Sequence, residues 1–113
     1  MTRRAPIEIR AAKDEVFVVF ADYLRPEDLA EEGVRLLEAV PDNAALVIDL
    51  SALECLDALE CGFVVELLRR CRKADITCRE HVRQTLELLS PSYRQGRDVP
   101  IRLMGVRSPS GGP

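Results

Sequence analysis

The chain has 113 residues, of which 47% are hydrophobic and 31% charged, and its net charge is −3 at pH 7. This suits one soluble domain with a single core, and the acidic balance without any Trp argues against nucleic-acid binding. No apolar run is long enough to span a membrane and no signal-type segment follows Met1, so we expect a cytoplasmic protein without a membrane span.

The first forty residues predict a hairpin followed by a helix. Residues 7–10 alternate at period two, residues 16–20 form a second β-favouring run, and a turn near Lys13 would join them. Pro26 suits the first turn of a helix, and Pro41 would end it. The apolar stripe of this helix consists of Leu29, Gly33, Leu36, Leu37 and Val40.

Residues 46–73 decide the fold class. The run from Leu46 to Leu50, interrupted only by Asp49, predicts a strand that is covered on both faces and lies in the middle of a sheet. After a loop, Asp57 and Glu60 have the spacing of a capping box, so a helix should begin there. Its apolar stripe consists of Leu59, Phe63, Val64, Leu67, Leu68 and Cys71.

This strand, loop and helix resemble the STAS domain, which is named for sulfate transporters and anti-sigma factor antagonists. In that family the helix opens with an Asp-Ser-Ser-Gly-Leu-Gly type motif, whose second Ser, or Thr, is phosphorylated by a partner kinase. Asp57 and Gly62 match the motif, but Ala58 and Leu59 stand where its two hydroxyl residues would be. The resemblance covers residues 7–73, and Leu59 cannot accept a phosphate.

The last third departs from the family pattern. A STAS-like chain would form a parallel strand directly after this helix, but residues 74–76 show no β-favouring run. Thr77 and Glu80 instead have the spacing of a second capping box, which predicts a third helix over residues 77–90. A strand is expected only at residues 99–106. Residues 108–113 are Gly, Ser and Pro and should be a disordered tail, which leaves residues 1–107 as one domain.

The predicted fold is therefore an α/β domain with a STAS-like mixed sheet and the order β-β-α-β-α-α-β. Two alignments of residues 77–90 stay open. In one they are an inserted helix, and the family's last helix is missing. In the other they are the family's last helix, and the strand before it has been lost.

Neither a metal centre nor an enzyme is indicated. On a continuous helix Cys71 and Cys78 would lie about 10 Å apart along the axis, too far for one zinc, and with His81 they lack a fourth ligand. We expect buried free thiols and a solvated His81. The sequence has no glycine-rich phosphate loop, nucleophile elbow or metal-ligand set, so no catalytic, cofactor or metal residues are assigned.

The resemblance implies a non-enzymatic protein–protein interaction module in bacterial signalling that lacks the phosphorylation switch. The partner would be a protein such as an anti-sigma factor or kinase, or a second copy of the chain. Glu60 would serve as a helix cap or imitate a phosphate. The residues expected to bind the partner are Asp57, Ala58, Leu59, Glu60 and Phe63.

Two other functions stay open. The first is a structural or regulatory subunit of a larger assembly, either associated with a transporter ATPase or part of a stress-signalling complex. The second is a phosphoregulated anti-sigma factor antagonist that uses another hydroxyl, for which Ser51 is the nearest candidate. Charge is divided along the chain, because residues 1–66 carry −9 and residues 67–113 carry +6, which can mark a partner surface.

Overall fold

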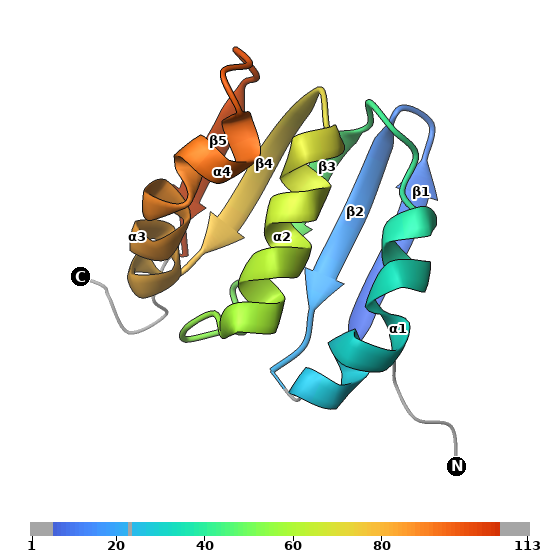
Figure 1. Ribbon diagram of the computed structural model, residues 1–113, viewed down its shortest axis with the longest axis vertical. Helices are drawn as coiled ribbons and strands as arrows, with labels where there is room; N and C mark the ends of the chain where they lie inside the picture. Colours follow the sequence, from blue (N-terminus) through green and yellow to red (C-terminus); the bar gives the residue numbers. More distant parts are fainter. Residues whose placement is uncertain (1–5, 23, 107–113) are drawn as a thin grey trace, which may run out of the picture.

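The computed structural model describes residues 6–22 and 24–106, which form a five-stranded mixed sheet and four helices (Figure 1). In space the strands follow their order in the chain, from β1 at one edge to β5 at the other. β1 and β2 are antiparallel, whereas β2 to β5 run parallel. The strands are β1 (Ile7–Ala12), β2 (Glu15–Phe20), β3 (Ala45–Asp49), β4 (Lys73–Cys78) and β5 (Ile101–Gly105). The helices are α1 (Pro26–Glu38), α2 (Ala58–Arg70), α3 (Glu80–Leu88) and α4 (Ser90–Arg94).

The predicted hairpin and helix are confirmed, but α1 ends at Glu38, so Val40 of the predicted stripe lies outside it and Pro41 is not what ends it. The hairpin turns at Lys13, whose φ of 49° lies in the left-handed region that tight hairpin turns require. Pro26 is the first residue of α1, where its fixed φ suits a helix and its missing N–H costs no hydrogen bond.

β3 is the middle strand of the sheet, as predicted, but it is covered on one face only. Leu46 and Ile48 are buried beneath the helices, and all four helices lie on that side of the sheet (Figure 1). Val47 and Asp49 point to the opposite face and are only half-buried. The expectation of cover on both faces was wrong because a nearly continuous apolar run does not distinguish a partly shielded face from a covered one.

The core is centred on α2, which lies in front of β3, between α1 and α4 (Figure 1). Val64, Leu67 and Leu68 are fully buried. Phe63 meets Phe20 of β2 edge to face, with ring centroids 5.8 Å apart and an angle of 70° between the rings. The helix is thereby fixed against both the sheet and the β2 side of the core.

The prediction that no strand directly follows the second helix was wrong. α2 ends at Arg70, and the chain enters β4 almost at once, so Cys71 lies outside the helix and the assumption of a continuous helix through Cys78 fails. The strand's inward residues are Ala74, Ile76 and Cys78, which alternate with Lys73, Asp75 and Thr77 on the other face. Small and polar residues weaken the β-favouring signal, although the period of two is present.

The observed order is consequently β-β-α-β-α-β-α-α-β. Both alignments of residues 77–90 assumed that no strand precedes them, and β4 removes that assumption. The predicted capping box at Thr77 is also wrong, because α3 begins after Arg79 without a side-chain cap. A strand near residues 99–106 is confirmed as β5, whereas α4 was not predicted. The predicted tail at residues 108–113 lies outside the described residues.

Candidate docking site at the start of helix α2

The first turn of α2 is closed by the predicted capping box. The Glu60 N–H donates to Asp57 Oδ1 over 2.7 Å, and the Asp57 N–H donates to Glu60 Oε1 over 2.9 Å. The backbone N–H groups of Asp57 and Glu60 would otherwise be unpaired at the helix N-terminus. Each is satisfied here by the side chain of the other residue. The box fixes where α2 begins, and so fixes the positions of Ala58 and Leu59 in its first turn.

Glu60 is a buried group and not a surface one. Only 7% of the residue is exposed, and burial raises the pKa of its carboxyl above the ordinary value, against the opposing hydrogen bond from the Asp57 backbone. A carboxylate that imitates a phosphate must be accessible to the partner. The buried position of Glu60 therefore favours its role as a helix cap over the role of a phosphate mimic. The same surroundings raise the pKa of the Cys61 thiol, through burial first and the nearby Asp57 and Glu60 carboxylates second.

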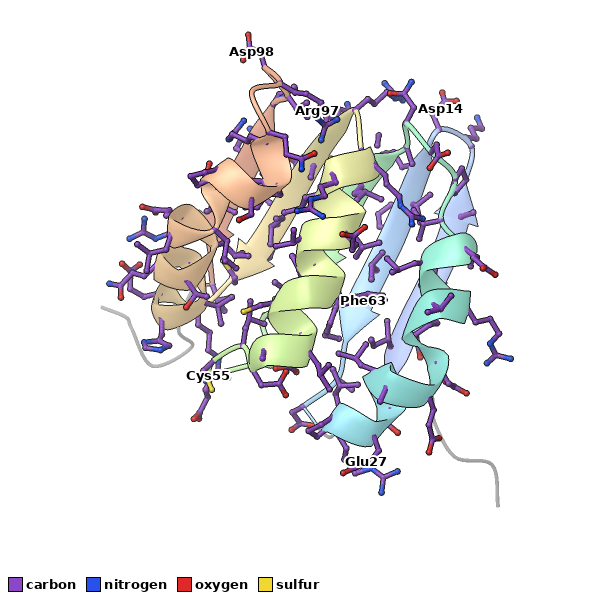
Figure 2. All side chains as sticks on the ribbon, in the orientation of Figure 1. Asp14, Glu27, Cys55, Phe63, Arg97 and Asp98 are labelled. Carbon is purple, nitrogen blue, oxygen red and sulfur yellow. The ribbon has the colours of Figure 1, made fainter. Side chains whose placement is uncertain are left out.

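A groove runs between α1 and α2 and joins several of the predicted partner-binding residues. Its volume is about 370 Å³, and most of its lining is apolar. Leu59 on α2 is 46% exposed and Val34 on α1 is 72% exposed. Phe63, on the side of α2 toward α1 (Figure 2), is only 5% exposed and forms part of the floor. The groove is lined by Leu29, Gly33, Val34, Leu37, Ala58, Leu59, Gly62, Phe63 and Glu66.

The α1 side of the groove was missed by the sequence analysis. Val34 stands outside the buried stripe of α1 and is the apolar residue on a helix surface otherwise rich in acids. The position of Val34 could have indicated a surface site in the sequence, because a large apolar residue outside the core stripe of a helix is not needed for packing the core. A structure was needed to show that it lies opposite Leu59 across the groove.

The helix that forms one side of the groove, α1, carries more acids than bases. α1 contains the acids Glu27, Asp28, Glu31, Glu32 and Glu38 and a single basic residue, Arg35. On α2, Glu66 accepts a hydrogen bond of 2.6 Å from Arg69, which offsets its charge. Glu27 and Asp28 pair with Arg25, and Glu32 pairs with Arg35. Helix α1 as a whole keeps a net negative charge, but its residues in the groove lining are uncharged.

The other candidate, Ser51, lies in the turn after β3 and is already engaged. Its hydroxyl donates to Asp49 Oδ1 over 2.5 Å, and its N–H donates to the same oxygen over 2.9 Å. Its carbonyl accepts from Arg79 Nε over 2.9 Å. Adding a phosphate here would bring two negative groups together at Asp49, with the Arg79 guanidinium as the nearby compensating charge.

The cysteines and His81 form no site. All four cysteines are free; Cys71 and Cys78 are buried, Cys61 is partly buried and Cys55 is exposed, so the expectation of buried thiols holds for the first two and is wrong for Cys55. Across residues 6–22 and 24–106, no group of three or more His, Cys, Asp or Glu side chains is placed to hold a metal ion. In the same ranges, no helix has the length and apolar character needed to cross a membrane.

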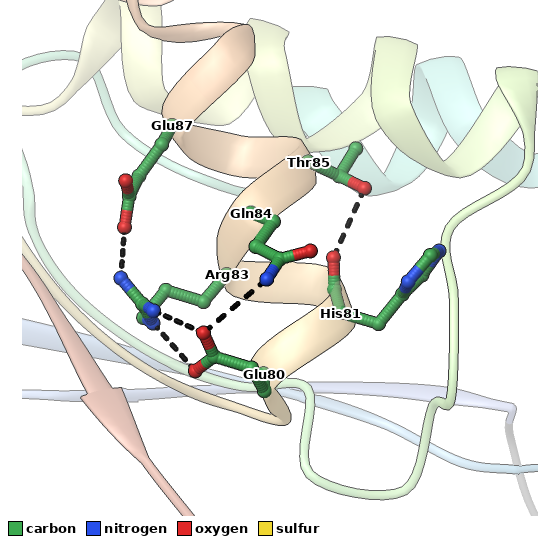
Figure 3. A network of polar contacts seen from close by, with 6 residues as sticks. All are labelled: Glu80, His81, Arg83, Gln84, Thr85 and Glu87. Atoms are coloured by element: carbon green, nitrogen blue, oxygen red, sulfur yellow. Dashed lines mark hydrogen bonds and ion pairs between the residues drawn. The ribbon is translucent and has the colours of Figure 1, made fainter.

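His81 is exposed on α3, beside a network of polar contacts (Figure 3). Arg83 pairs with both Glu80 and Glu87, and Gln84 donates to Glu80 over 3.4 Å. The hydrogen bond from Arg83 lowers the pKa of Glu80 below its ordinary value. Only the backbone carbonyl of His81 takes part, accepting from the Thr85 hydroxyl over 3.1 Å.

Comparison with known proteins adds no relative. No protein-family model matches the chain, and neither a curated protein nor a solved structure matches it.

Proposed function

We propose that the chain is a STAS-like protein–protein interaction module of bacterial signalling that lacks a phosphorylation switch and docks its partner in the α1–α2 groove. The observation that carries the proposal is the groove itself, where Val34 and Leu59 expose apolar surface on either side of a floor that includes Phe63. Apolar surface of this kind favours a partner over water. A hydroxyl at position 59 would make the site switchable, whereas leucine makes it constitutive.

The charge beside the groove indicates the chemistry of the partner. An amphipathic helix with an apolar stripe and basic flanks would cover the floor and meet the acids of α1. Such an association should be faster at low salt, because opposite charges guide the encounter. The same resemblance to STAS domains is the reason to expect that the partner is a protein and that binding takes place in the cytoplasm.

Two matched variants test the docking site. Leu59→Asp places a charge in the groove, and Leu88→Asp places the same charge at a residue that is 83% exposed on α3. Partners captured from the native cells are identified first, and their affinities for the purified variants are then measured. Leu59→Asp should weaken binding by at least about tenfold, a loss of about 1.4 kcal/mol, whereas Leu88→Asp should leave it unchanged. Equal effects of the two variants would remove the groove from the proposal.

The identity of the captured protein separates the two interaction functions. A switch-protein kinase or sigma-factor regulator supports the signalling module. A transporter ATPase or a scaffold supports a structural subunit of a larger assembly, which would use the same groove. Incubation with a cognate kinase, followed by mass spectrometry, tests the third function; phosphate on Ser51 would show that the module is regulated despite Leu59.

A further inference from the structure

The outer edge of β1 has backbone groups that no strand in the described part of the chain pairs with. Within residues 6–22 and 24–106, β1 is the outermost strand on its side of the sheet (Figure 1), and β2 is the only strand with which it pairs. The Ala21 N–H donates to the Pro6 carbonyl over 2.9 Å, which makes these two opposed residues a hydrogen-bonded pair. Such pairs alternate with non-bonded pairs along an antiparallel ladder. The residues whose N–H and C=O groups point outward are therefore Ile7, Ile9 and Ala11.

We infer that this edge pairs with the β1 strand of a second copy of the chain, antiparallel, with Ile9 opposite the partner's Ile9. In that register Ile7 lies opposite the partner's Ala11, and the opposed pairs formed by Ile7, Ile9 and Ala11 each exchange two hydrogen bonds. All outward groups of the edge are then satisfied, and the two sheets become one continuous sheet. The pairing uses the sheet edge and leaves the α1–α2 groove to another molecule.

The side chains of β1 are complementary to themselves in the same register. Glu8 lies opposite the partner's Arg10, and Arg10 lies opposite the partner's Glu8. Directly opposed residues of a non-bonded pair have Cα atoms about 4.5 Å apart, close enough for their charges to attract. Within one chain Glu8 and Arg10 approach only to 3.9 Å, and their side chains are 53% and 80% exposed, so both are accessible to a partner.

Other registers and the other edge lack this match. Sliding one copy by two residues brings Glu8 opposite the partner's Glu8, or Arg10 opposite the partner's Arg10, and leaves outward groups unpaired. At the β5 edge, the only basic side chain of the strand, Arg102, already pairs with Asp75 at 3.3 Å. A self-pairing of β5 about Leu103 would place Arg102 opposite the partner's Met104, with no opposite charge to meet it.

Charge reversal tests the pairing on the full chain. Sedimentation equilibrium over a wide concentration range should show a dimer forming as the wild-type concentration rises. Glu8→Arg and Arg10→Glu each create two like-charge pairs, so each should weaken self-association by at least about tenfold. An equimolar mixture of the two variants should restore the dimer, because every cross-copy pair is then Arg with Glu. Circular dichroism and thermal unfolding check that the variants remain folded.

A backbone variant gives an independent measurement. Ala11→Pro removes an outward N–H, and proline is tolerated on a sheet edge when its N–H would face solvent; the fold should survive and the dimer should weaken. In Ala12→Pro the lost N–H belongs to the β1–β2 ladder, so the monomer itself should lose stability. The Ile7, Ile9 and Ala11 amides should also exchange more slowly as concentration rises. A wild-type chain that stays monomeric at every concentration, or a dimer that both charge reversals leave intact, would overturn the inference.

Discussion

The α1–α2 groove and the outer surface of α3 lie on the same face of the sheet, yet their exposed side chains are arranged differently. On α3, the single positive charge of Arg83 is shared by Glu80 and Glu87, and the exposed apolar residue Leu88 stands apart from the α1–α2 groove. In the groove, Val34 and Leu59 expose apolar surface that nothing within the described chain covers. Ion-paired and solvated charges are satisfied in water, whereas the apolar lining of a groove is stabilised when another molecule covers it. This contrast supports the groove as the proposed docking site.

The largest expected effect comes from the groove floor. Phe63→Ala should lower the free energy of unfolding by about 3–5 kcal/mol, because it leaves a cavity in the core and removes the edge-to-face contact with Phe20. Denaturant unfolding measures the loss. Val34→Ala, at the exposed side of the same groove, should change stability by less than about 0.5 kcal/mol. Similar losses of stability in both variants would mean that Val34 and Phe63 contribute equally to the core, so that the groove has no separate buried floor and exposed side.

The cap of α2 should have the next largest effect on stability. Asp57→Ala removes the acceptor of the Glu60 N–H and should cost about 1 kcal/mol. Asp57→Asn keeps an oxygen acceptor at the N-cap and should retain most of the stability. Thermal or denaturant unfolding compares the two, and an alanine variant as stable as the asparagine variant would show that the box does not hold the first turn in place.

Glu60 gives a test that depends on pH. Its pKa is raised by burial, so the folded state favours the protonated carboxyl, and wild-type stability falls as pH rises from the ordinary value of 4.5 through the raised one. Glu60→Gln keeps an acceptor for the Asp57 N–H but carries no charge. The variant should match the wild type in acid and exceed it in stability at neutral pH. A variant that is less stable at neutral pH would show that the helix dipole outweighs burial.

The sequence predicted the parts of the fold where a local pattern and a local hydrogen bond coincide. The capping box at Asp57 and Glu60 is an example, because the spacing of the two residues is itself the geometry of the bonds. There the deciding interaction lies within three residues of the pattern. The middle place of β3 was predicted from its apolar run, but it is decided by pairing with β2 and β4.

The prediction failed where tertiary context decides. In β4, Asp75 is tolerated because it faces the uncovered side of the sheet, where Arg102 of β5 approaches it at 3.3 Å. Without that neighbour the segment does not look like a strand. The groove was only half predicted for the same reason, since Val34 and Leu59 are 25 positions apart in the chain and only packing brings them together.

The smallest expected effect is on α3. Arg83→Gln removes both ion pairs, but these groups are solvated, and exposed pairs contribute little to stability. The sensitive measurement is a titration of the Glu80 carboxylate by NMR. Its pKa is lowered first by the hydrogen bond from Arg83, so it should rise toward the ordinary value in the variant.

The sign of the stability effect follows from that pKa. A lowered pKa means that the pair stabilises the folded state above the ordinary value of 4.5 and that this contribution disappears as pH falls through the folded pKa. In Arg83→Gln that acid-dependent loss should vanish, while binding in the groove should stay at its wild-type affinity. Weaker binding in this variant would mean that α3 belongs to the docking surface, and the contrast between the ion-paired charges of α3 and the apolar groove would no longer support the groove as the docking site.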